Sequence, residues 1–173
     1  MSANEAMIAV IGCGNSNRRD DGAGPAVLRA LAAGGLDREV HQVALLDAGT
    51  DGMAVMFAAR GCRTLIVVDA CQSGSPPGAI FEVPGAELAR RYQPSLSTHD
   101  FRWDHALHAG RAMYRENFPA DVTVFLIEAG SIDLGVGLTP TVADAADRVV
   151  ARICALVQSR LQDWAPRERH MAK

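Results

Sequence analysis

The sequence has no excess of basic residues, and its arginines are scattered rather than clustered. It carries 17 lysines and arginines against 20 aspartates and glutamates, which gives a formal net charge of -3. A protein that holds nucleic acid by its phosphates needs a concentrated basic surface. We therefore expect no nucleic-acid partner.

Long hydrophobic runs are also missing. No apolar stretch approaches the roughly 20 residues that a membrane-spanning helix needs, and the first residues do not form a basic region followed by an apolar one. These absences predict a soluble, cytoplasmic protein that does not enter a membrane.

Closely spaced cysteines are the third absence. Cys13, Cys62, Cys71 and Cys154 form no C-x-x-C pair, so neither a zinc knuckle nor a disulfide framework is indicated. We expect reduced thiols, with Cys62 and Cys154 packed as small hydrophobic side chains.

The chain predicts one α/β domain over residues 1–173, because its length and its 49% hydrophobic content suffice for a single core. Apolar runs predict buried strands at 7–11, 39–46, 64–68 and 122–127, with a short edge or antiparallel strand at 79–83. Strands that alternate with helices predict a three-layer αβα fold, an open, mostly parallel twisted sheet of about five strands with helices on both faces. The charged segment 163–173 is expected to be a flexible tail.

Helix boundaries follow from capping residues and apolar spacing. The first helix is expected from about Gly22 to the pair Gly34-Gly35, which suits a left-handed C-terminal cap. Thr50 is the expected N-cap of a short second helix. A stripe that begins at Trp103 predicts a helix to about residue 117, starting at or next to His99. Thr139-Pro140-Thr141 is expected to open the last helix.

Acidic residues stand at the ends of the predicted strands. Asp21 follows the first strand, and the others end at Asp47, Asp69 and Glu128. Ligands of open α/β sheets bind at the carboxyl ends of the strands. Neighbouring carboxylates raise one another's pKa unless a cation is present, so these residues predict a metal site that a histidine could complete.

Simpler roles stay open for several of these residues. Asp20 or Asp21 can cap the first helix, and Asp47 can hold the turn at Gly49-Thr50 through its side chain. His105 and His108, on the predicted helix after His99, are expected to be structural or solvated.

Six motifs in one order carry a resemblance: Gly12-x-Gly14-Asn15, Asp20-Asp21-Gly22-x-Gly24, Leu46-Asp47-x-Gly49-Thr50-x-Gly52-Met53, Val68-Asp69-Ala70, His99 and Gly137-Leu138-Thr139-Pro140-Thr141-Val142. Over nearly the whole chain they resemble the hydrogenase maturation proteases. These endopeptidases remove the C-terminal extension of a nickel-iron hydrogenase large-subunit precursor once nickel is in place.

The resemblance implies that Asp21, Asp69 and His99 contact a metal, with Asp21 and Asp69 closest to the chemistry. The metal is nickel supplied by the substrate, and no permanent organic cofactor is implied. Nickel accepts imidazole and carboxylate as well as thiolate. A metal-activated water, a metal-polarised carbonyl and a carboxylate general base all remain open.

The same resemblance predicts a substrate rim. Asn15 is expected to stabilise the glycine loop, and Asp47, Gly49, Thr50 and Gly52 to line the rim. Where relatives usually have apolar residues, this chain has Ser16-Asn17-Arg18-Arg19, which predicts a preference for an acidic peptide partner.

Three other functions remain open. The chain could be a non-catalytic, nickel-dependent chaperone or binding module for a hydrogenase precursor. A dinucleotide-binding domain is disfavoured because Asn17 replaces the third glycine of G-x-G-x-x-G and two acids would face the pyrophosphate. A hydrolase that uses Cys13 as its nucleophile is disfavoured because the sequence places no histidine and acid where they could activate that thiol. Cys13 or Cys71 could instead offer a soft metal ligand. The particular hydrogenase, the cleaved bond and the oligomeric state are left open.

Overall fold

A computed structural model of the chain describes residues 7–36, 40, 42–90 and 103–164. Its strands form one sheet in the order β2-β1-β3-β5-β4. They span β1 Ile8–Cys13, β2 Val43–Gly49, β3 Thr64–Cys71, β4 Ile80–Pro84 and β5 Asp121–Glu128. All neighbours pair in parallel except β4, which is antiparallel to β5 at one edge. The predicted open, mostly parallel sheet and the antiparallel edge strand are both confirmed.

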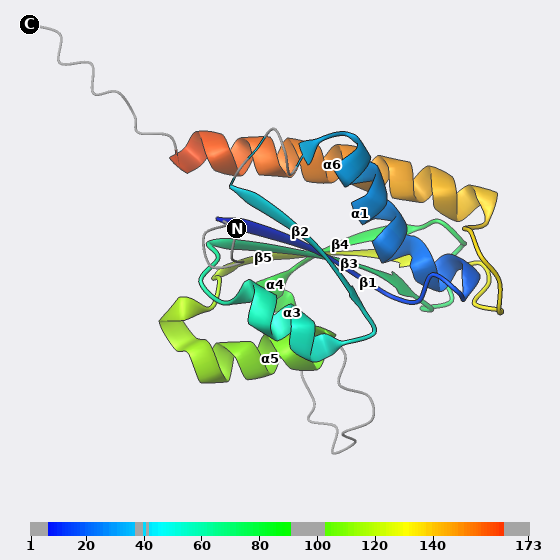
Figure 1. The fold of residues 1–173 in the computed structure, drawn as a ribbon. Helices are drawn as coiled ribbons and strands as arrows, with labels where there is room; N and C mark the ends of the chain where they lie inside the picture. The colour runs from blue at the N-terminus through cyan, green and yellow to red at the C-terminus, as the bar shows by residue number, and fades with distance from the viewer. Residues whose placement is uncertain (1–6, 37–39, 41, 91–102, 165–173) are drawn as a thin grey trace, which may run out of the picture.

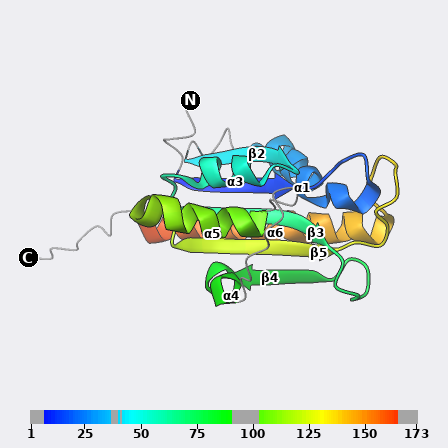
Figure 2. The ribbon, with the colours of Figure 1, turned by 90° about the horizontal axis from the view of Figure 1, so that it is seen from below.

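Helices cover both faces of this sheet. The helical segments are η1 Arg19–Gly22, α1 Ala23–Ala33, α3 Gly52–Ala59, α4 Gly85–Arg90, α5 Trp103–Tyr114, η3 Arg115–Asn117 and α6 Pro140–Trp164. Helices α1 and α6 lie on one face of the sheet, and α3 and α5 lie on the other (Figure 1). Figure 2 shows the molecule from the side of α3 and α5. Among the described residues, no helix is long and apolar enough to cross a membrane.

Alternation along the strands divides the core in two. In β1, Ile8 and Val10 pack with α1 and α6, whereas Ala9 and Ile11 pack with α3 and α5. Period-two alternation continues to the strand ends. Asp69 therefore lies on the α5 face of β3, two residues after the buried Val67.

Three expected boundaries, two of β2 and one of α3, are wrong. The strand begins at Val43 rather than near residue 39, and it continues past Asp47. Helix α3 is capped by Asp51, not Thr50, because Oδ1 of Asp51 accepts hydrogen bonds from the N–H groups of Met53 and Ala54, at 2.9 and 3.3 Å. The helix begins one residue later than the expected cap allows.

The first helix also begins differently from expectation. Asp20 and Asp21 lie in the η1 turn, and Gly22 is the N-cap of α1 without a side-chain cap. The interpretation of either acid as the cap of α1 is therefore wrong. At the other end, Gly35 has a φ of 81°, as expected for a left-handed termination.

The last helix extends further than predicted. Helix α6 includes Asp163 and Trp164, so a tail that begins at residue 163 is two residues too long. The indole of Trp164 holds the helix end, because the guanidinium of Arg63 lies 4.6 Å from its ring centroid. Residues 165–173 lie outside the described part.

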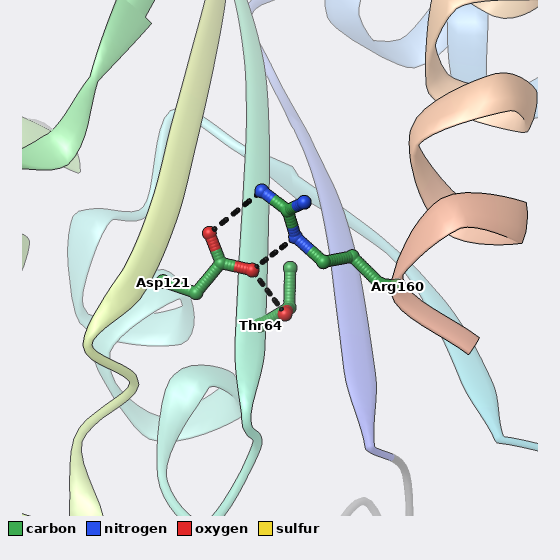
Figure 3. A network of polar contacts seen from close by, with 3 residues as sticks. All are labelled: Thr64, Asp121 and Arg160. Carbon is green, nitrogen blue, oxygen red and sulfur yellow. Dashed lines mark hydrogen bonds and ion pairs between the residues drawn. The ribbon is translucent and has the colours of Figure 1, made fainter. Parts of the chain in front are cut away.

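A polar network joins α6 to the beginnings of β3 and β5 (Figure 3). Nε of Arg160 donates to Oδ2 of Asp121 at 2.6 Å, and its terminal nitrogen donates to Oδ1 at 3.2 Å. The hydroxyl of Thr64 donates to the same Oδ2 at 2.6 Å. Burial raises the pKa of Asp121, but these hydrogen bonds outweigh it and the pKa is lowered.

Arg160→Gln is expected to reduce the free energy of unfolding by about 1–2 kcal/mol, because it leaves the half-buried Asp121 with a single strong donor. The control is Arg152→Gln, which removes an exposed arginine 3.9 Å from Glu82 and should change stability by less than about 0.5 kcal/mol. Urea unfolding monitored by circular dichroism measures both. Equal effects would contradict the assigned role of Arg160.

Candidate active site

The carboxyl ends of β1 and β3 meet at a topological switch point. The chain leaves β1 through α1 to reach β2 on one side, and β3 pairs with β1 on the other. Ligands of open α/β sheets bind at such points. Asp21 lies in the turn after β1 and Asp69 near the end of β3, so the fold brings these two predicted residues to the same place.

Asp69 is a buried carboxylate held from two sides. Its Oδ1 accepts the N–H of Ala70 at 2.8 Å, and its Oδ2 accepts the indole N–H of Trp103 at 2.8 Å. Only 5% of Asp69 and 8% of Trp103 is exposed. These bonds fix the orientation of the carboxylate, and the one from Trp103 ties the beginning of α5 to the end of β3.

Gly14 separates Asp21 from Asp69. An ideal Cβ at Gly14 would overlap the backbone carbonyl of Asp21 and lie 3.6 Å from Oδ1 of Asp69, and its φ of 121° also favours glycine. The side chain of Asp21 is half-buried, and its Oδ2 accepts the N–H of Asn15 at 3.0 Å. Only a residue without a side chain lets the first loop approach the end of β3 this closely.

Asp20 is the acid whose structural role sequence reasoning missed. It is fully buried, and its Oδ2 accepts the N–H groups of Gly130 and Ser131, at 2.8 and 2.9 Å, and the hydroxyl of Thr139, at 2.9 Å. Its Oδ1 accepts the N–H of Thr139 at 2.6 Å. Burial raises the pKa of Asp20, but these hydrogen bonds lower it overall. Asp20 therefore anchors the loop that leads into α6.

The other two strand-end acids are engaged elsewhere. Asp47 is exposed and follows the alternation of Val43 and Leu45, which places it on the face opposite Asp69. Its Oδ1 accepts the N–H of Gly49 at 2.9 Å, as the turn-holding alternative expected. Asp47 therefore holds the turn after β2 and lies apart from Asp69.

Glu128 binds the loop after β3. It accepts the hydroxyl and N–H of Ser73, at 2.7 and 2.8 Å, and the N–H of Gly74 at 2.9 Å. These bonds, led by the Ser73 hydroxyl, lower the pKa of Glu128 to about 2. A carboxylate so fully occupied shapes the loop instead of joining the predicted metal site.

The cysteines near the switch point have structural surroundings. The thiol of Cys71 donates to Oε2 of Glu128 at 3.2 Å, and burial together with this carboxylate raises its pKa to about 12. Such a thiol stays protonated at neutral pH, which disfavours a thiolate ligand. Cys13 is buried. His105, on α5, lies 4.0 Å from Asp104, and His108 on the same helix is exposed.

The residues predicted to form the substrate rim lie in the loop after β1, at the end of β2 and at the beginning of α3. The side-chain oxygen of Asn15 accepts the N–H of Asn17 at 2.9 Å, which stabilises the first loop as expected. Gly49 has a φ of 52°, Thr50 is exposed and Gly52 is buried at the beginning of α3. His99 lies outside the described residues. Among the residues that are described, no three histidine, cysteine or acidic side chains converge as a metal-ion site.

Comparison with protein families gives a match over most of the chain. The family model described as hydrogenase maturation protease, HycI, matches residues 25–156. The chain belongs to the hydrogenase maturation protease family. It is therefore an enzyme of the endopeptidase class that acts in hydrogenase maturation, which confirms the family and enzyme class predicted from the sequence.

Individual relatives agree with this membership. The chain is 27% identical to the hydrogenase 2 maturation protease of Escherichia coli over 164 residues, 93% of this chain and 96% of the relative. It is 29% identical to the coenzyme F420 hydrogenase subunit delta of Methanothermobacter thermautotrophicus over 155 residues, 86% of this chain and 93% of the relative. The solved structure of the hydrogenase-maturating endopeptidase HybD from Escherichia coli superimposes with a TM-score of 0.74 at 25% identity, covering 88% of this chain and 93% of that one.

Proposed function

We propose that this protease removes the C-terminal extension of a nickel-iron hydrogenase large-subunit precursor after nickel insertion, with Asp21, Asp69 and His99 contacting nickel held by the substrate. The observation that carries the proposal is the approach of Asp21 and Asp69 around Gly14 at the switch point. The proposal keeps the cytoplasmic location predicted from the sequence and requires no organic cofactor.

The environment of Asp69 supports contact with a cation. The N–H groups of Ala70 and Trp103 hold this buried carboxylate in a fixed orientation at the end of β3, so its charge is positioned before any cation arrives. Nickel accepts carboxylate and imidazole ligands. His99, the third residue of the proposed set, stands four positions before Trp103 in the sequence, and Trp103 is the residue that binds Asp69.

Asp21 is suited to proton transfer. Its Oδ2 is held by Asn15, whereas no hydrogen bond within the described residues engages its Oδ1. A half-buried carboxylate with one open oxygen can accept a proton from an attacking water. Nickel in the substrate would polarise the scissile carbonyl or acidify that water. In this proposal Asp21, Asp69 and His99 contact the metal, and Asp21 also acts as the general base.

The test compares a nickel-loaded and a nickel-free large-subunit precursor, each incubated with the purified protein. Mass spectrometry of the precursor's C-terminus should detect loss of a short peptide from the nickel-loaded form alone. Cleavage of both forms would contradict recognition of nickel. Absence of cleavage with binding intact would favour a non-catalytic binding module for the precursor.

Trp103→Phe is expected to reduce kcat/KM about tenfold, because phenylalanine fills most of the space but removes the N–H that orients Asp69. The control is Trp164→Phe, on a ring that contacts Arg63 at the far end of α6, and it should leave kcat/KM unchanged. An unchanged kcat/KM in Trp103→Phe would contradict the positioning role.

A further inference from the structure

Two loops at the carboxyl edge of the sheet are joined through their backbones. The N–H of Arg19 donates to the carbonyl of Gly135, and the N–H of Gly135 donates to the carbonyl of Asn17, both at 2.9 Å. Arg18 and Gly135 form a parallel bridge, and Nε of Arg18 donates to the carbonyl of Ile132 at 3.2 Å. The turn after β1 and the loop after β5 lie side by side at the same end of the molecule (Figures 1 and 2). They form one continuous surface.

This surface is held in place from below. Asp20, buried beneath it, binds Gly130 and Ser131 at the beginning of the second loop and Thr139 at its end. A loop fixed at both ends presents its side chains with little loss of conformational freedom on binding. The exposed residues between these anchors are therefore pre-organised for contact with a partner.

The side chains on top are apolar and basic. Leu134 is 80% exposed and Val136 is 85% exposed. Gly135, between them, lies under the side chain of Arg19, since a Cβ there would be 3.3 Å from Nε of that arginine. Single exposed aliphatic residues are ordinary on protein surfaces. Two that flank an arginine on an anchored loop form the mixed apolar and cationic surface that protein interfaces favour.

The charged residues of this surface are two arginines and one acid, Asp133, which leaves a net positive charge. Arg18 and Arg19 are exposed, and within the described part of the chain neither forms a salt bridge. The one acid on the second loop, Asp133, accepts the hydroxyl of Ser131 at 2.9 Å. Two arginines in a protein of net charge -3 are too few for a nucleic-acid or lipid surface. They complement an acidic peptide.

We propose that Arg18, Arg19, Leu134 and Val136 form a docking surface for an acidic segment of the precursor that also carries apolar side chains. The proposal rests on the proposed function in one respect, since it assigns the segment to the substrate of the protease. The surface includes the turn that carries Asp21, so a segment bound there lies beside the site of cleavage. The docking surface selects the substrate, and Asp21 and Asp69 act on it.

The test uses Arg18→Gln combined with Arg19→Asn, because asparagine tolerates the positive φ of 44° at position 19. The matched control is Arg152→Gln combined with Arg115→Asn, which removes the same charge and also replaces an exposed arginine of positive φ, 48°. We expect the first pair to raise KM for the nickel-loaded precursor about tenfold with kcat unchanged, and to flatten the salt dependence of KM. The control pair should leave KM and its salt dependence unchanged.

A second arm separates the docking surface from the proposed function. Fluorescence anisotropy measures binding of a labelled synthetic peptide that alternates glutamate and leucine, with a lysine–leucine peptide as the comparison. Leu134→Ser with Val136→Ser should weaken binding of the acidic peptide about tenfold, whereas Phe57→Ser with Met113→Ser, at exposed apolar residues of α3 and α5, should not.

The outcomes of the two arms are distinct. Selective binding of the acidic peptide that both docking-surface variants lose supports the proposal even if no precursor is cleaved. Cleavage of the precursor with the same KM by wild type and by the arginine pair overturns the docking surface while leaving the protease function intact. Equal binding of the two peptides also overturns it.

Discussion

Replacing Asp69 by asparagine is expected to lower kcat/KM for a nickel-loaded precursor about 10³-fold, because the reaction loses the charge that recognises the metal. Asparagine keeps the shape of the side chain and one oxygen. Its amide must face either the N–H of Ala70 or that of Trp103, so the free energy of unfolding should fall by about 1–3 kcal/mol. A mass-spectrometric cleavage time course measures the rate, and circular dichroism verifies the fold.

The control for this variant is Asp47→Asn. Asp47 also lies at the carboxyl edge of the sheet, but it is exposed on the opposite face and holds the N–H of Gly49, which an asparagine oxygen can accept as well. We expect kcat/KM to stay within about threefold of wild type. A folded Asp69→Asn protein that cleaves at the wild-type rate would remove Asp69 from the site, and equal losses in the two variants would point to a general charge effect.

Much of the fold could be predicted because the strands carry local signals. The run 64–68 is apolar on both faces and became the central strand β3, and Gly35 ends α1 in the left-handed conformation that a glycine pair favours. The predicted N-cap of α3 is wrong because two adjacent residues can both act as a cap. Thr50 and Asp51 are both good N-caps, and only the path of the chain out of β2 selects Asp51.

The sequence predicted that the acids of the candidate site lie at strand ends, but it did not predict their hydrogen-bond partners. That Asp21 and Asp69 both lie next to Gly14 follows from parallel strands sharing one carboxyl edge. The indole that holds Asp69 comes from 34 residues further along the chain, and the donors that hold Glu128 come from 54 and 55 residues before it. No local pattern identifies contacts between such distant residues. The sequence therefore predicted acidic residues along the carboxyl edge of the sheet. In the structure Asp21 and Asp69 lie at the switch point, whereas Asp47 and Glu128 bind N–H groups of a turn and a loop.

The pair Asp20-Asp21 shows the same limit within two adjacent residues. Both acids lie in η1, yet Asp20 is fully buried and binds groups 110 to 119 residues away, whereas Asp21 is half-buried beside Gly14. In a turn, neighbouring side chains point in different directions. Asp20 therefore anchors the loop before α6, whereas Asp21 lies at the switch point.

Asp20→Ala is expected to reduce the free energy of unfolding by about 4 kcal/mol, because it removes the buried acceptor of three part-buried N–H groups and one hydroxyl. For a chain of this length that loss corresponds to a fall in Tm of about 10 °C. Asp133→Ala, on the same loop, removes an exposed acid that binds only one hydroxyl, and it should cost less than about 1 kcal/mol. Differential scanning calorimetry measures both variants.

The stabilisation by Asp20 should also depend on pH. Its folded pKa lies below the ordinary value of 3.8, so the unfolded chain binds the proton first as the pH falls. The contribution is therefore fully present above about pH 5 and declines as the pH falls below 3.8 through the folded pKa. The difference in Tm between wild type and Asp20→Asn should narrow between pH 5 and pH 3, since asparagine cannot ionise. A difference that stays constant over this range would mean that the carboxylate charge does not hold the loop, and that packing around Asp20 stabilises it instead.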